Sequence, residues 1–175
     1  MEEVRLYIAA GEAEKPSRID GCRRCSFVVL MQRGDELRAF WGLARIRDTT
    51  ALFAFAINAA LTRCLPDDFD VGPWPTVTVI VKSPDFWERI DQASHREAYK
   101  PKKTADQREA WKSAAALRGM FEIRPARGPE TAEDDRLLSK ATVLQRDYVQ
   151  RALLAVPTDF IGLSEEGELE TGALA

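Results

Sequence analysis

Apolar and β-branched residues are concentrated in one short stretch, from Thr76 to Ser83. Strand alternation gives it two faces, with valines on one and a mixed set on the other: Val77, Val79 and Val81 against Thr76, Thr78, Ile80 and Lys82. Apolar residues on both faces are typical of a strand that is covered on both sides. Helix-like segments flank it, which indicates an α/β sheet whose ligands bind at the carboxyl ends of strands. The residue at that end is Lys82.

The remaining pattern predicts three strands ahead of this one and further helices and one strand after it. Alternating apolar runs mark the strands, a turn at Gly34 joins the second to the third, and apolar residues at helical spacing mark the helices. The order is β-β-β-α-β-α-α-β-α, which predicts a five-stranded mixed sheet with helices on both faces. The expected strands cover 4–9, 25–31, 37–46, 76–83 and 120–124, and the expected helices 51–63, 85–92, 105–117 and 131–155.

The length of 175 residues suits one domain, expected over 1–156, followed by an acidic and flexible tail over 157–175. The sequence has no apolar run of membrane-spanning length, and its acidic start does not resemble a signal peptide. With three cysteines, we expect a cytoplasmic protein without structural disulfides or a membrane partner. The net charge of −3 disfavours nucleic-acid binding by the whole surface but leaves room for a local basic patch.

A basic segment between the expected helices is one such patch. Its cations and aromatic ring would contact phosphate and stack on a base or sugar; they are Arg96, Tyr99, Lys100, Lys102 and Lys103. The alternative is a solvated loop beside helices that are anchored by core tryptophans.

The pair Cys22-Arg-Arg-Cys25 has the spacing of half a zinc site. A closed site requires four ligands, and only the remote Cys64 and His95 would complete it. The pair also enters a strand, whereas a redox Cys-x-x-Cys opens a helix. We therefore interpret both as ordinary thiols, and we assign His95 no catalytic role.

The element order and several local stretches resemble the ribonuclease H family over roughly residues 4–150. Asp48-Thr-Thr-Ala-Leu-Phe-Ala-Phe-Ala resembles the start of the family's first helix, and Val77-Thr-Val-Ile-Val-Lys-Ser its fourth strand. Tyr99-Lys-Pro-Lys-Lys-Thr resembles its basic protrusion, and Ala132-Glu-Asp-Asp-Arg-Leu-Leu its final helix. The resemblance implies the ribonuclease H fold and a partner that is an RNA/DNA hybrid or another duplex.

The catalytic positions of the family do not match. Family members hold two divalent ions about 4 Å apart with clustered carboxylates, which suit hard ions such as Mg²⁺. The aligned positions carry other residues, namely Ala9, Phe55, Lys82, Ala126 and Arg136. A register shift of one or two residues would bring back an acid such as Asp134 or Asp135, but restoring the whole cluster requires several independent shifts.

The substitutions suggest a phosphate site in place of the metal centre. Lys82, Arg127 and Arg136 would converge there and hold a phosphate without cleaving it, since Lys and Arg bind phosphate directly. The alternative is that Lys82 and Arg136 pair with the acids at Glu133, Asp134 and Asp135.

Three hypotheses follow. The first is a catalytically inactive, cofactor-free pseudoenzyme that binds nucleic acid through these cations and the basic segment. The second is a protein-interaction scaffold that uses the acidic tail or an exposed sheet edge. The third is a divergent ribonuclease H that depends on Mg²⁺ or Mn²⁺ and that Asp134/Asp135→Asn would inactivate.

The first hypothesis predicts that Lys100/Lys102/Lys103→Ala weakens binding to a labelled RNA/DNA hybrid. Each lost phosphate contact lowers the slope of log affinity against log salt by about 0.9. Anisotropy titrations across a salt series would measure that slope, and an unchanged slope would remove this segment from the interface.

Overall fold

The computed structural model describes residues 3–47, 51–64, 75–82, 122–126 and 128–174. The expected helices over 85–92 and 105–117, and the basic segment between them, lie outside these residues. The described elements are β1 (Glu3–Glu12), β2 (Arg23–Arg33), β3 (Glu36–Ile46), α1 (Ala51–Cys64), β4 (Thr76–Ile80), β5 (Glu122–Ala126), α4 (Ala132–Ala155), β6 (Gly162–Glu168) and the 3-10 helix η1 (Thr171–Leu174).

The strands form one mixed sheet in the order β5-β4-β1-β2-β3-β6. β1, β2 and β3 form an antiparallel meander, with the turn between β2 and β3 at Gly34, whose φ is +58°. β4 and β5 add in parallel to β1, and Tyr7, Ile80 and Ala126 are at the same level. The five predicted strands and the mixed sheet are confirmed. β5 ends later than expected, so Ala126 closes a strand and is not in a loop.

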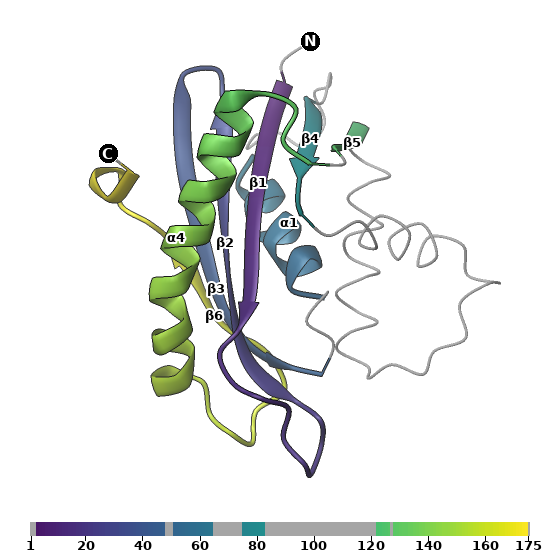
Figure 1. Ribbon diagram of the computed structural model, residues 1–175, viewed down its shortest axis with the longest axis vertical. Coiled ribbons are helices and arrows are strands. Elements are labelled where there is room, and N and C mark those ends of the chain that lie inside the picture. Colours follow the sequence, from purple (N-terminus) through teal and green to yellow (C-terminus); the bar gives the residue numbers. More distant parts are fainter. Residues whose placement is uncertain (1–2, 48–50, 65–74, 83–121, 127, 175) are drawn as a thin grey trace, which may run out of the picture.

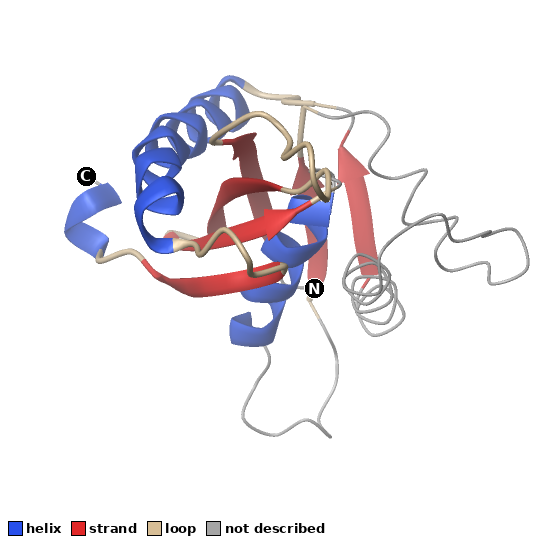
Figure 2. Cartoon of the chain, turned by 90° about the horizontal axis from the view of Figure 1, so that it is seen from below, coloured by secondary structure: helices blue, strands red, loops and turns tan. Residues whose placement is uncertain are grey.

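The sheet has a helix on each face, as predicted (Figures 1 and 2). α1 packs on the face that carries Leu6, Ile8, Val77 and Val79. The opposite face, with Tyr7, Ala9, Val28 and Ile80, packs against α4. Val77 and Ile80 thus belong to different hydrophobic clusters, which confirms that β4 is covered on both sides. Among the described helices, none is long and apolar enough to cross a membrane.

The sixth strand corrects the expectation of a flexible tail. Residues 162–168 form β6, which pairs antiparallel with β3 and extends the predicted five strands by one. The pattern conceals this strand because it is rich in Glu and Gly and lacks β-branched residues. Its position is fixed by packing, since Gly167 lies against the indole of Trp41, which is itself stacked on Tyr148 with ring centroids 5.1 Å apart.

This close approach predicts that Gly167→Ala destabilises the protein. A Cβ at Gly167 would lie 2.8 Å from Cζ2 of Trp41, and such overpacking costs about 1–3 kcal/mol. Gly172→Ala is the matched control in the same C-terminal segment, because nothing lies within 4 Å of a Cβ there. Urea unfolding of both variants would check the difference, and equal free energies of unfolding would mean that β6 is not held against Trp41.

Candidate nucleic-acid interface

A small cavity lies where the fold brings the carboxyl ends of β1 and β4 together. It has a volume of about 190 Å³ and is lined from four elements: Ile8, Ala9 and Ala10 of β1, Phe53 of α1, Lys82 after β4, and Leu138, Thr142 and Gln145 of α4. The sheet register explains the meeting of β1 and β4. Tyr7 is paired with Ile80, so Ala9 and Lys82 lie two residues further along their parallel strands.

Lys82 is the one ionisable group among the described residues that line this cavity, and its side chain is exposed. The two polar side chains of α4 that line the cavity are hydrogen-bonded to other protein groups. Thr142 Oγ1 donates to the Leu138 carbonyl over 2.9 Å, and Gln145 Nε2 donates to Ser26 Oγ over 2.9 Å. The cavity therefore offers one accessible cation against an apolar and amide background.

These lining residues do not fit a pair of divalent ions. Mg²⁺ takes oxygen ligands, chiefly carboxylates, and the lining residues in the described part of the chain include no Asp or Glu. Within the same described residues, no group of three or more His, Cys, Asp and Glu side chains is arranged to hold a metal ion.

Arg136 does not join Lys82. It is exposed on the first turns of α4, where its Nη2 and Nε lie 2.6 and 2.8 Å from the carboxylate oxygens of Glu133. This is the pairing that the alternative interpretation of Arg136 predicts. The pair holds the pKa of Glu133 below its usual value. The described α4 residues that line the cavity are Leu138, Thr142 and Gln145 instead.

Two other aligned positions lie against the core. Among the described residues of α1, Phe53 lines the cavity, and both Phe53 and Phe55 pack against the core on the α1 face. Ala126 is buried at the end of β5. Arg127 lies outside the described residues, as do Arg96, Tyr99, Lys100, Lys102 and Lys103.

Asp134 takes part in a buried polar cluster that the sequence pattern does not predict. Its side chain is 1% exposed and accepts from Tyr7 Oη over 3.0 Å and from Arg5 Nη2 over 3.1 Å. It also accepts from the backbone N–H of Thr131, whose hydroxyl accepts from the Asp134 N–H, a reciprocal capping box at the start of α4. The Thr-x-x-Asp spacing was the signal available in the sequence.

This cluster sets the protonation of its members. Burial raises the pKa of Asp134, but the hydrogen bonds from Tyr7 and the backbone and the charge of Arg5 outweigh it, so the net pKa is lowered. Burial and the bond to Asp134 raise the pKa of Tyr7 well above its usual value. A cavity of about 480 Å³ is lined by members of this cluster and by Glu3, Gln32 and Glu133. The Asp134 carboxylate is thus engaged in anchoring α4 to β1.

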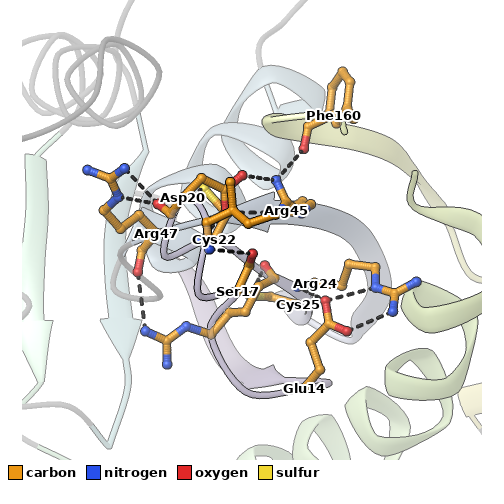
Figure 3. A network of polar contacts seen from close by, with 11 residues as sticks. Glu14, Ser17, Asp20, Cys22, Arg24, Cys25, Arg45, Arg47 and Phe160 are labelled. Carbon is orange, nitrogen blue, oxygen red and sulfur yellow. Dashed lines mark hydrogen bonds and ion pairs between the residues drawn. The ribbon is translucent and has the colours of Figure 1, made fainter. Parts of the chain in front are cut away.

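The two cysteines lie in a polar network at the start of β2 (Figure 3). Arg45 donates to both carboxylate oxygens of Asp20, over 2.7 and 3.0 Å, and Arg24 forms a similar bidentate pair with Glu14. Cys22 and Cys25 are both buried. Burial raises the pKa of Cys25 to about 12, so at neutral pH this thiol is protonated and is a poor metal ligand.

Comparison with known proteins identifies the fold. No family model and no curated protein matches the sequence. Among solved structures, the chain is similar to LC9-RNase H1, a type 1 RNase H with the type 2 active-site motif, with 13% identity and a TM-score of 0.59 over 99% of this chain and 79% of that one. An N-terminal RNase H domain from Mycobacterium tuberculosis gives 14% identity and a TM-score of 0.52 over 90% and 100%.

A third similar structure is the foamy viral protease–reverse transcriptase in complex with an RNA/DNA hybrid, with 9% identity and a TM-score of 0.51 over 86% of this chain. This chain spans about a fifth of the viral protein, 20% of its length. At these identities the likeness defines the fold. The chain therefore has the ribonuclease H-like fold that its element order predicts.

The Asp134 cluster predicts a pH-dependent stability difference. Asp134→Asn removes the charge that Arg5 and the helix N-terminus stabilise, which costs about 1–3 kcal/mol at neutral pH. Because the folded-state pKa is lowered, this contribution is present above the unfolded value of about 4 and decreases as pH falls below it.

Denaturant unfolding between pH 3 and pH 7 would measure this effect. Asp147→Asn is the control, since Asp147 is an exposed acid of the same helix, and its effect should stay within about 0.5 kcal/mol. An Asp134→Asn difference that grows at low pH would contradict the assignment.

Proposed function

We propose that this chain is a catalytically inactive ribonuclease H-like domain that binds nucleic acid, an RNA/DNA hybrid or another duplex. The observation that carries the proposal is the cavity at the carboxyl ends of β1 and β4. Among the described residues that line it, Lys82 is the one charged group and none is a carboxylate. A lysine ammonium attracts a phosphate oxygen and repels a divalent cation, so the same position favours holding a backbone phosphate over metal-dependent cleavage.

The ribonuclease H-like fold supports an RNA/DNA hybrid as the class of ligand. A foamy viral protein with a similar fold was solved with an RNA/DNA hybrid bound. In the proposed interface Lys82 contacts one phosphate, and the basic residues at Arg96, Lys100, Lys102, Lys103 and Arg127 supply further contacts, with Tyr99 stacking on a base or sugar. Arg136 was assigned to this interface from the sequence, and its pairing with Glu133 leaves it a lesser contributor.

The proposal predicts that Lys82→Ala weakens hybrid binding and lowers the salt slope by about 0.9, the loss of one phosphate contact. The assay is fluorescence anisotropy of the purified protein with a labelled hybrid, across a KCl series without divalent ions. Lys15→Ala is the matched control, because Lys15 is exposed in a separate cavity beside Asp20 and Asp159. Absence of hybrid binding at low salt, or equal slopes for the two variants, would overturn the proposal.

The active-nuclease alternative has a sharper test in light of the structure. Asp134→Asn would also disturb the contacts with Tyr7 and Arg5, so loss of cleavage in a double variant would not identify a metal ligand. Asp135→Asn alone is cleaner because Asp135 is exposed. Cleavage of the hybrid in Mg²⁺ or Mn²⁺ that this single change abolishes would replace the inactive assignment.

A further inference from the structure

The sheet ends at β6 on one side, and in the described part of the chain only β3 pairs with this strand. The N–H of Leu169 donates to the Ala39 carbonyl over 2.8 Å. Leu169 therefore points its backbone groups toward β3. Because this direction alternates along an antiparallel strand, Glu166 and Glu168 turn their backbone N–H and C=O groups away from β3. These groups form an edge that another strand can extend.

The side chains along this edge are acidic on both faces of the sheet. Glu165 is paired with Leu43, on the α4 face, and Glu166 with Gly42, on the α1 face. Both glutamates are exposed, and neither forms an ion pair with another described residue. Glu168 differs, because Arg38 Nε lies 2.7 Å from its carboxylate. A strand laid along β6 would therefore meet two uncompensated negative charges, one on each side of its backbone.

Exposed apolar side chains lie beside the start of the same strand. Phe160 and Ile161, which directly precede β6, are 37% and 44% exposed, and Ile19 in the neighbouring loop is 97% exposed. Arg45 holds the two segments together, since it pairs with Asp20 and donates to the Phe160 carbonyl over 3.3 Å. Apolar side chains of a docked strand would find contacts at this end.

We propose that β6 is a docking edge for a basic, extended polypeptide segment, which adds to the sheet as its next strand. Backbone hydrogen bonds to Glu166 and Glu168 would supply the pairing, and cationic side chains opposite Glu165 and Glu166 would supply the selectivity. The charge disfavours two other occupants: a second β6 would bring like charges together, and nucleic acid would be repelled.

This docking edge is separate from the proposed nucleic-acid interface. Lys82 follows β4, and β1, β2 and β3 lie between β4 and β6. Four strand spacings of about 4.8 Å place the two surfaces about 19 Å apart. Each proposal can therefore fail without the other, and each set of variants is measured with both ligands.

The first experiment uses a fluorescein-labelled peptide, Lys-Lys-Val-Lys-Lys-Val-Lys, whose adjacent lysines point to opposite faces of a strand, and anisotropy with the full chain. We expect binding that Glu165→Gln/Glu166→Gln weakens by about fivefold, the effect of two exposed ion pairs. The matched control is Asp35→Asn/Glu36→Gln, which removes the same charge from exposed positions in the β2–β3 hairpin and should leave peptide binding unchanged. The β6 variant should not weaken hybrid binding.

The second experiment separates strand addition from charge attraction. Two isomeric peptides carry three N-methyl groups each, either on the amides of residues 2, 4 and 6 or on those of residues 3, 5 and 7. Only one of these alternating sets can point toward β6, so one isomer should lose binding and the other should retain it. Equal binding by both isomers, equal loss by both, or equal effects of the two double variants would overturn the proposal.

Discussion

β1 is enclosed on four sides, and this enclosure constrains the rest of the molecule. It pairs antiparallel with β2 and parallel with β4, and its side chains alternate between the α1 and α4 clusters. Ala9 faces the α4 cluster and is 8% exposed, so a small residue here leaves room for a cavity under the helix. A charged group in that cavity needs contact with water, which a long side chain at the end of a strand can reach. Lys82 occupies such a position.

The anchoring of α4 follows from the same strand. Tyr7 and Arg5 both donate from β1 to Asp134, and the Thr131 capping box fixes the helix start. Once the first turn is fixed, helical spacing directs Leu138, Ala141 and Gln145 toward the sheet. Arg136 falls outside this face and projects into solvent. One buried carboxylate thus decides which side chains of the helix can reach the cavity.

The sequence predicted the parts of the fold that depend on hydrophobic periodicity. The pattern predicts β4 because apolar residues stand on both of its faces, and it predicts α1 because apolar residues recur at helical spacing. β6 could not be recognised in this way. The glutamates of β6 face solvent, and only Gly162, Leu163 and Gly167 are less exposed. The strand is ordered by its pairing with β3 and by the contact between Gly167 and Trp41.

The candidate site follows from the sequence only in part. Alternation along a strand is local, and it predicts Lys82 at the end of β4, where this side chain lines the cavity. Positions on a helix are harder to assign from a family pattern, because a shift of two residues turns a side chain by about 200°. Among the described residues, Phe53 and Leu138 line the cavity, and Phe55 and Arg136 do not.

The attachment of β6 also has a consequence for motion. The strand is paired on one side among the described residues, and most of its side chains are exposed, whereas β1 and β2 have neighbours on both edges and buried faces. Segments with few buried contacts open locally at a lower free energy than the core. Amide protons of β6 would therefore exchange with solvent through local detachment, while those of β1 and β2 would exchange only when the whole sheet unfolds.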